Sequence, residues 1–270
     1  MTNLNRRLSI LILVLAPVLG VPQRAAAEED DPPGRAARLA YAQGSVSFQP
    51  AGTEDWVAAV VNRPITTGDK LWTDRNSRAE LHIGSAAIRL ADKTGFSFLN
   101  LTDNMVQIQL SAGVIGIHVR HLDQNEAVEV DTPNLAFNLL RPGDYRLEVN
   151  EAGDTTVVSV RGGEGEVTGG GQAFTIHSNQ RATFSGTDQL ASDIDHLGGH
   201  DDFDRWCRDR DHREDRAPSV RYVSRDVIGY QDLDDSGDWR TVPDYGHIWV
   251  PRRVVAGWAG SGSHRGAGRG

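Results

Sequence analysis

Between residues 36 and 187 the chain alternates apolar and polar residues in short runs, which is the pattern of half-buried β-strands. The runs Val106–Leu110 and Ile115–Val119 show it clearly. Further runs cover 127–131, 135–140, 145–149, 155–160, 165–168, 173–177 and 181–184. Glycine, asparagine and aspartate lie between them, as turns require. No part of this region keeps a 3.6-residue apolar period, so the sequence predicts an all-β sandwich or roll of many short antiparallel strands around one core.

The composition changes to densely alternating charge over residues 188–219. Phe203, Trp206 and Cys207 fall at helical spacing, which predicts a linker with a short charged helix. Several metal-ligating side chains occur here: His196, His200, Asp201, Asp202, Asp204 and His212. They form no HExxH motif and no Cys/His pairing, so a solvated helix is favoured over a metal site. Cys207 is the only cysteine, which excludes an internal disulfide, and we interpret it as a partly buried thiol in the helix.

Residues 220–258 are rich in aromatic side chains, and five of them are candidate binding residues: Tyr222, Tyr230, Trp239, Tyr245 and Trp249. Closely spaced aromatics between short turns favour a small stacked sheet, because buried aromatics dominate small cores. The alternative is an exposed surface for a glycan, peptidoglycan or a protein, since exposed Trp and Tyr are common anchors.

The same stretch partly matches a calcium-binding EF-hand loop. Asp232, Asp234, Ser236 and Gly237 fit positions 1, 3, 5 and 6, but Pro243 stands where the loop needs a bidentate glutamate. Proline has no ligating side chain and would break the helix that leaves the loop. We therefore predict that this stretch binds no calcium.

The first 27 residues predict export. Arg6 and Arg7 precede an apolar run over 8–21, and three alanines ending at Ala27 offer a cleavage site, as in a secretory signal peptide. An uncleaved anchor is the alternative, but the run is shorter than the roughly 20 residues that span a bilayer, and Pro17 interrupts it. Cleavage would remove three arginines and leave 25 basic against 37 acidic residues, a net charge of −12. Such a chain is a poor nucleic-acid binder, and we expect a periplasmic or secreted protein without a later transmembrane segment.

Specific motifs accompany the strand pattern. Gly68–Asp69 is followed by Leu71 and Thr73, Ser77 by Ala79 and Leu81, and Thr132–Pro133 ends the run at 127–131. In this order the region 36–187 resembles the FecR-like periplasmic domain. The resemblance implies an extracytoplasmic β-module. It departs from the family at 141–144, where Arg-Pro-Gly-Asp replaces the usual Arg-Gly-Thr turn. Membrane regulators of this family carry an anti-sigma segment and a transmembrane helix ahead of the domain, and we find neither in this sequence.

The region from Phe203 to Trp258 resembles a bacterial domain of unknown function that follows FecR-like domains in exported proteins. The matching segments are 203–206, 210–211, 222–223, 229–230, 232–234, 237–239, 243–246, 249–251 and 257–258. In that family the aromatic pattern continues further, whereas residues 259–270 form a low-complexity tail here. We therefore expect 220–258 to be a truncated aromatic module.

No catalytic motif is recognisable. The sequence has no G-x-S-x-G, no Ser/His/Asp set in a familiar context and no phosphate-binding glycine loop. We predict a non-enzymatic cell-envelope protein without a cofactor or metal, which binds or scaffolds an envelope protein or polysaccharide. Two alternatives stay open: a signalling partner of an outer-membrane receptor and sigma-factor system, and a wall-polymer hydrolase with an unrecognised site.

Overall fold

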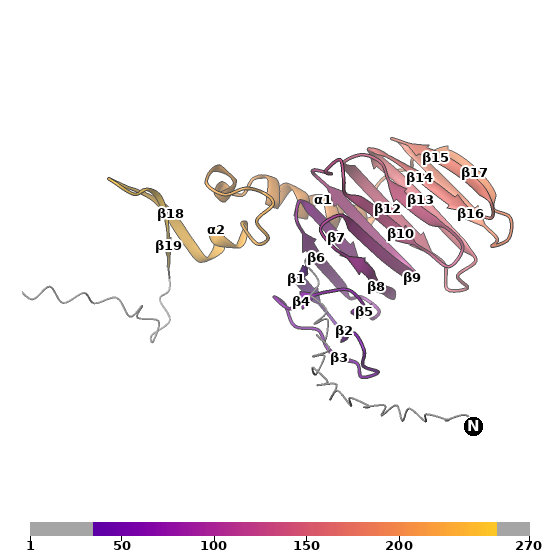
Figure 1. The fold of residues 1–270 in the computed structure, drawn as a ribbon, viewed down its shortest axis with the longest axis horizontal. Helices are drawn as coiled ribbons and strands as arrows, with labels where there is room; N and C mark the ends of the chain where they lie inside the picture. Colours follow the sequence, from indigo (N-terminus) through magenta and orange to yellow (C-terminus); the bar gives the residue numbers. More distant parts are fainter. Residues whose placement is uncertain (1–34, 253–270) are drawn as a thin grey trace, which may run out of the picture. The chain divides into compact units, whose positions relative to one another are not determined.

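The computed structural model describes residues 35–252, in which 17 strands form one connected β-structure (Figure 1). The pairings divide it into two sheets that share strand β9. Sheet A has the order β4 (Pro64–Ile65), β1 (Ala37–Gln43), β6 (Arg78–Ile83), β7 (Ala86–Leu90), β9 (Met105–Val119), β12 (Gly143–Val149), β13 (Thr155–Gly162), β16 (Gln180–Ser185) and β17 (Ala191–His196). Sheet B has the order β3 (Val57–Ala58), β2 (Val46–Gln49), β5 (Lys70–Thr73), β8 (Thr94–Leu101), β9, β10 (Ala127–Asp131), β11 (Ala136–Leu139), β14 (Glu164–Gly169) and β15 (Gln172–His177). The predicted all-β fold of many short strands is confirmed.

Strand β9 joins the two sheets because it bends at Gly113. Residues before Gly113 pair with β8 and β10 in sheet B, and residues from Gly113 onward pair with β7 and β12 in sheet A. Gly113 has φ +87°, and a Cβ there would lie 2.5 Å from the carbonyl oxygen of Lys93. The two predicted runs 106–110 and 115–119 are therefore one strand of 15 residues, and its pairing with β10 is parallel.

The two sheets enclose one apolar core. Its fully buried side chains come from the inward positions of strands in each sheet, for example Leu81 and Ile88 of sheet A and Phe98 and Ile108 of sheet B. Alternation along each strand puts the intervening side chains on the outer faces. On the outer face of sheet A these include many charged groups.

The turns at Gly68–Asp69 and Thr132–Pro133 connect strands in the structure. Asp69 follows Gly68 (φ +85°) and its carboxylate accepts hydrogen bonds from the amides of Ala51 at 2.9 Å and Thr66 at 2.8 Å. Thr132–Pro133 directly follows β10. At residues 141–144, where the sequence differs from the FecR-like pattern, the Tyr145 hydroxyl donates to the carbonyl of Arg141. This hydrogen bond fixes the turn that leads into β12.

The segment 188–219 is not only a linker and helix. Ala191–His196 forms β17 and pairs with all of β16, so the β-structure extends to residue 196 and not only to 187. The predicted charged helix is α1 (Asp202–Asp215), and Asp201 and Asp204 form a capping box at its start. Among the described residues no helix is long and apolar enough to cross a membrane.

The C-terminal part consists of the 3-10 helix η1 (Pro218–Arg221), the short helix α2 (Asp232–Ser236) and a hairpin of β18 (Gly237–Val242) and β19 (Gly246–Pro251). Trp239 and Trp249 face each other across the hairpin, and Tyr222 stacks on Trp239 with 4.4 Å between ring centroids. The expected signal peptide, the low-complexity tail and residues 253–258 of the aromatic module lie outside the described residues.

Candidate functional site: a charged interface between sheet A and helix α1

The outer face of sheet A carries a band of charged side chains. Because Leu81, Ile88 and Ile117 point into the core, their neighbours in the strands point outward. The outward charged side chains are Glu80 and His82 of β6, Arg89 of β7, His118 of β9, Asp144 and Arg146 of β12 and Arg161 of β13. Helix α1 covers this band.

One face of α1 complements the band. Asp204, Cys207, Asp211 and Glu214 are spaced by three or four residues and so lie on the same side of the helix. Gly116 of β9 lets the helix approach closely, since a Cβ there would lie 3.2 Å from Cys207 Sγ and 3.5 Å from the Phe203 ring. The helix thus buries charged groups against the sheet, with Asp204 and Glu214 among its buried residues.

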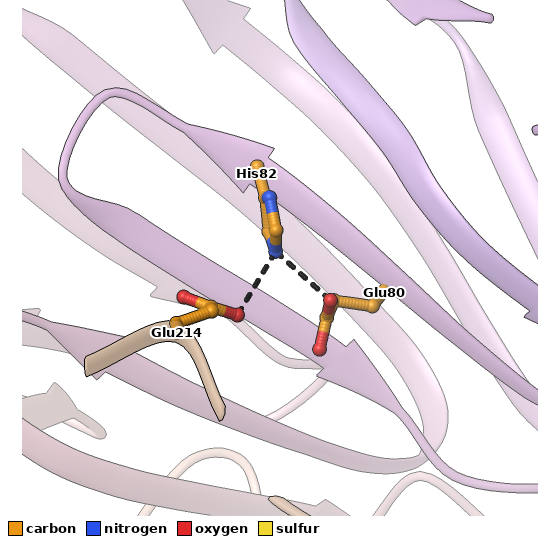
Figure 2. Close-up of side chains that lie close together, drawn as sticks. All are labelled: Glu80, His82 and Glu214. Atoms are coloured by element: carbon orange, nitrogen blue, oxygen red, sulfur yellow. Dashed lines mark hydrogen bonds and ion pairs between the residues drawn. The ribbon is translucent and has the colours of Figure 1, made fainter. Parts of the chain in front are cut away.

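The most buried part of this interface centres on Glu80 (Figure 2). Its carboxylate accepts from Arg89 Nε at 2.6 Å, from Arg210 Nη2 at 2.7 Å and from His82 Nε2 at 2.9 Å. His82 Nε2 also lies 3.2 Å from Glu214 Oε1, so the imidazole stands between two carboxylates. Since Arg89 and Arg210 donate to Oε2 of Glu80 and Arg210 also donates to Oε1, this cluster is an ion-pair network and not an open metal site.

The partners shift the pKa values of these groups. Burial alone would raise the pKa of Glu80, but hydrogen bonds from His82 and Arg210 hold it well below its usual range. Burial likewise opposes the charge on His82, yet hydrogen bonds to Glu214 and Glu80 raise its pKa above the ordinary value. For Glu214 burial is outweighed by His82 and Arg89, and its pKa is lowered. All three shifts favour the charged forms.

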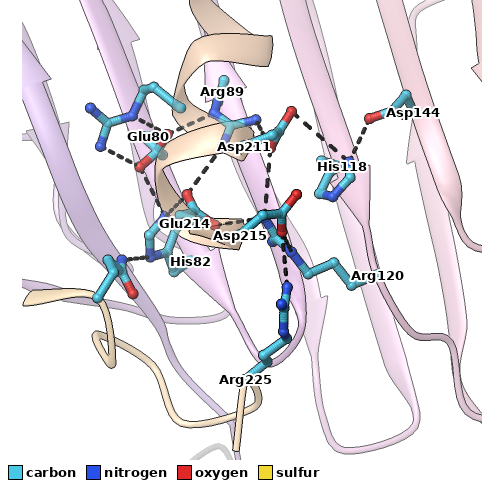
Figure 3. Close-up of polar contacts among 12 residues, drawn as sticks. Glu80, His82, Arg89, His118, Arg120, Asp144, Asp211, Glu214, Asp215 and Arg225 are labelled. Atoms are coloured by element: carbon cyan, nitrogen blue, oxygen red, sulfur yellow. Dashed lines mark hydrogen bonds and ion pairs between the residues drawn. The ribbon is translucent and has the colours of Figure 1, made fainter. Parts of the chain in front are cut away.

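Further ion pairs extend the interface along the last turns of α1 (Figure 3). Arg89 also contacts Asp211 at 2.7 Å and Glu214 at 3.2 Å. Arg120, which follows β9, lies 3.0 Å from Glu214 and 3.1 Å from Asp215. Arg225 reaches Asp215 at 2.9 Å from the C-terminal part.

The first turn of α1 is held by two arginines from neighbouring strands. Arg146 contacts Asp201 at 2.6 Å and Asp204 at 3.0 Å, and Arg161 reaches the other oxygen of Asp204 at 2.5 Å. Acidic groups at a helix N-terminus also suit the helix dipole. Both ends of α1 are therefore fixed to sheet A by charge.

A pocket of about 530 Å³ lies between sheet A and α1. His118, Asp144 and Asp211 line it together with Phe203 and Cys207. Burial raises the pKa of the Cys207 thiol to about 12, so the thiol stays protonated at neutral pH, in line with its interpretation as a partly buried group. Asp211 has a raised pKa owing to burial, whereas that of Asp144 is lowered by His118 despite burial.

None of the six metal-ligating residues considered from the sequence belongs to a ligand cluster in the described part of the chain. The groupings found there are Glu80 with His82 and Glu214, and His118 with Asp144 and Asp211. The calcium-loop carboxylates are directed to different partners: Asp232 contacts Arg38, and Asp234 accepts from the Ser219 hydroxyl at 2.7 Å. They do not converge on one point.

The five aromatic candidates differ in exposure. Tyr245 is 81% exposed at the hairpin turn, and Tyr222 is 37% exposed beside Trp239. Trp239 and Trp249 are part-buried, and their indole N–H groups donate to Ser219 Oγ and the Leu233 carbonyl. Tyr230 is buried and its hydroxyl donates to the Glu214 carbonyl, so this candidate binding residue lies in the interior of the described structure.

Sequence reasoning missed the charged interface as a whole. The available signal was a set of charged residues at the outward positions of successive strands, combined with acidic residues spaced along one face of the helix. Neither signal predicts a buried interface alone, because charged side chains on the outer face of a sheet or on a helix are usually solvated.

No family model matches this chain, and no curated protein matches it. Two crystal structures of a protein from Parabacteroides distasonis, described as a "putative anti-sigma factor", are similar with a TM-score of 0.42 each and 14% and 13% identity. Each similarity covers 47% of this chain and 59% of the other chain. These similarities assign this chain to no family, and the FecR-like resemblance stays a prediction.

Proposed function

We propose that this chain is an exported, non-catalytic binding or scaffold module of the cell envelope, with the FecR-like β-domain as its rigid part. The proposal rests on the exposure of aromatic side chains in and beside the hairpin of β18 and β19, which is attached to the β-domain. Tyr245 and Tyr222 are exposed, while Tyr230 and Gln231 attach the same segment to α1 and sheet A. Exposed tyrosines on a fixed support are effective anchors because few degrees of freedom are lost on binding.

The chemistry of the charged interface supports a structural role for its ionisable groups. Glu80, Arg89 and Glu214 are consumed by mutual ion pairs, and the Cys207 thiol has a pKa of about 12. A general acid or base needs a free position beside a substrate, and a nucleophile needs an activated form. The hydrolase alternative has no comparable support.

The test is co-sedimentation of the purified protein with peptidoglycan sacculi, together with crosslinking to envelope proteins. We expect saturable binding to one of these, weakened by Tyr245→Ala, with no release of soluble wall fragments. Arg240→Ala is a matched control because Arg240 is an exposed residue of the same hairpin. Release of wall fragments would favour the hydrolase, and crosslinking to an outer-membrane receptor would favour the signalling alternative.

A further inference from the structure

We propose that His118, Asp144 and Asp211 form a site for a divalent transition-metal ion, of which Zn²⁺ is the best fit, and that the ion links α1 to sheet A. The three residues come from β9, β12 and α1, elements that are separated in sequence and meet only in the fold. One ligating atom from each lies within 4.8 Å of the other two. This inference is independent of the binding role proposed above.

The distances suit an ion after small side-chain rotations. His118 Nδ1 lies 2.5 Å from Asp144 Oδ1 and 4.0 Å from Asp211 Oδ2. Ligand atoms of a tetrahedral Zn²⁺ stand about 3.4 Å apart, given bonds of about 2.1 Å. To hold the ion, His118 Nδ1 and Asp144 Oδ1 must move apart by a little under 1 Å. His118 Nδ1 and Asp211 Oδ2 must approach each other by somewhat less. Asp144 is half-exposed and its side chain can make this adjustment.

Asp211 has spare ligand capacity. Its Oδ1 is buried and accepts no hydrogen bond from the described residues. Arg89 Nη1 lies 2.7 Å from Oδ1 as an ion-pair partner but without hydrogen-bond geometry. Oδ1 therefore pairs with Arg89, and the other oxygen, Oδ2, which lies 4.0 Å from His118 Nδ1, is available to an ion.

The pocket completes the coordination. All three ligand residues line the cavity of about 530 Å³, which can supply water to the remaining positions. One imidazole nitrogen and two carboxylates suit Zn²⁺ or Mn²⁺ better than Ca²⁺ or Mg²⁺, which prefer oxygen ligands alone. The Glu80 cluster offers no equal site, since arginines already donate hydrogen bonds to both oxygens of Glu80.

The experiment is calorimetric titration of the chelator-treated, purified protein with Zn²⁺, Mn²⁺ and Co²⁺, with Mg²⁺ as a comparison. We expect one equivalent of Zn²⁺ to bind saturably, and His118→Ala and Asp144→Asn each to weaken binding at least tenfold. Asp144→Asn is the milder variant and guards against a folding defect, which circular dichroism would show. His121→Ala is the matched control, because His121 is an exposed histidine that follows β9 and its imidazole pairs with Asp123.

Two further readouts separate this site from adventitious binding. Bound Zn²⁺ should slow labelling of Cys207 by a thiol reagent, since the ion would hold α1 on the sheet over this residue. Cys207→Ser should leave the affinity for Zn²⁺ unchanged, because the thiol is not one of the three ligands. Absence of saturable binding by all three transition metals, or undiminished binding in His118→Ala and Asp144→Asn, would overturn the proposal.

Discussion

Glu80 and Arg89 stand directly opposite each other on β6 and β7, and their side chains form an ion pair that is almost completely buried. Burying two charges is costly unless further partners compensate them. Here α1 supplies those partners, because Arg210 reaches Glu80 and Asp211 and Glu214 reach Arg89. The buried pair explains why a strongly charged helix packs against this sheet.

Removing one member of this pair should strongly destabilise the protein. Arg89→Met would leave Glu80, Asp211 and Glu214 buried with less positive charge, and we expect a loss of about 3–5 kcal/mol in the free energy of unfolding. Urea denaturation followed by tryptophan fluorescence measures it. Lys93→Ala is the control, because the Lys93–Glu151 pair is exposed and should change stability by less than about 1 kcal/mol. Equal effects of the two substitutions would contradict this assignment.

The interface should also make stability depend on pH. The raised pKa of His82 means that its proton stabilises the folded state fully below the unfolded-state pKa of about 6.5, and that this contribution is lost as the pH rises through the folded-state pKa. The lowered pKa values of Glu80 and Glu214 act in the opposite direction, because their contribution is lost as the pH falls below about 4.5. Stability should therefore decline on both sides of a maximum.

Urea denaturation between pH 6 and pH 8 measures the histidine contribution below the range in which the raised pKa of the Cys207 thiol also lowers stability. We expect the free energy of unfolding of the wild type to decrease over this range, and His82→Gln to flatten the decrease. His121→Gln should leave the slope unchanged, since its side chain is two-thirds exposed. If the free energy of unfolding of His82→Gln decreased with pH as steeply as that of the wild type, another group would cause the effect.

The strands could be predicted from the sequence because burial on one face imposes alternation, and Ala127–Asp131 was predicted with its observed bounds. Strand β17 was missed since its side chains are all exposed and leave no apolar pattern. The site was missed for a different reason. Glu80 and Arg210 are 130 residues apart, and nothing local in either segment indicates that their charges meet. Only the fold determines which charges are solvated and which are buried.

Cys207 should be unreactive while α1 is docked. Its thiol is partly buried against Gly116 and has a pKa of about 12, so little thiolate exists at pH 8. We expect slow labelling by a disulfide reagent in the native protein and complete labelling in urea. Arg146→Ala, which releases the first turn of α1 from β12, should accelerate the labelling at least severalfold. Fast labelling of the wild type would show that α1 does not stay on the sheet.

Two fragments test where the β-domain ends. The fragment 35–197 contains β17, whereas 36–187 leaves β16 with an unpaired edge. We expect β-type circular dichroism from each, with a lower melting temperature for 36–187 because it loses a whole strand pairing. Each should be less stable than the full chain, since Glu80 and Arg89 lose their partners from α1. A fragment 36–187 as stable as 35–197 would restore the boundary expected from the family resemblance.

The aromatic residues should separate into structural and binding groups. Tyr230→Phe removes a buried hydrogen bond to the Glu214 carbonyl and should cost about 0.5–1.5 kcal/mol in the free energy of unfolding. Tyr245→Ala removes an exposed side chain and should leave stability within about 0.5 kcal/mol while weakening binding to the envelope partner. Thermal denaturation and the sedimentation assay on the same two variants measure the separation. Loss of binding in Tyr230→Phe alone, with Tyr245→Ala unchanged, would place the binding surface elsewhere than on the exposed hairpin.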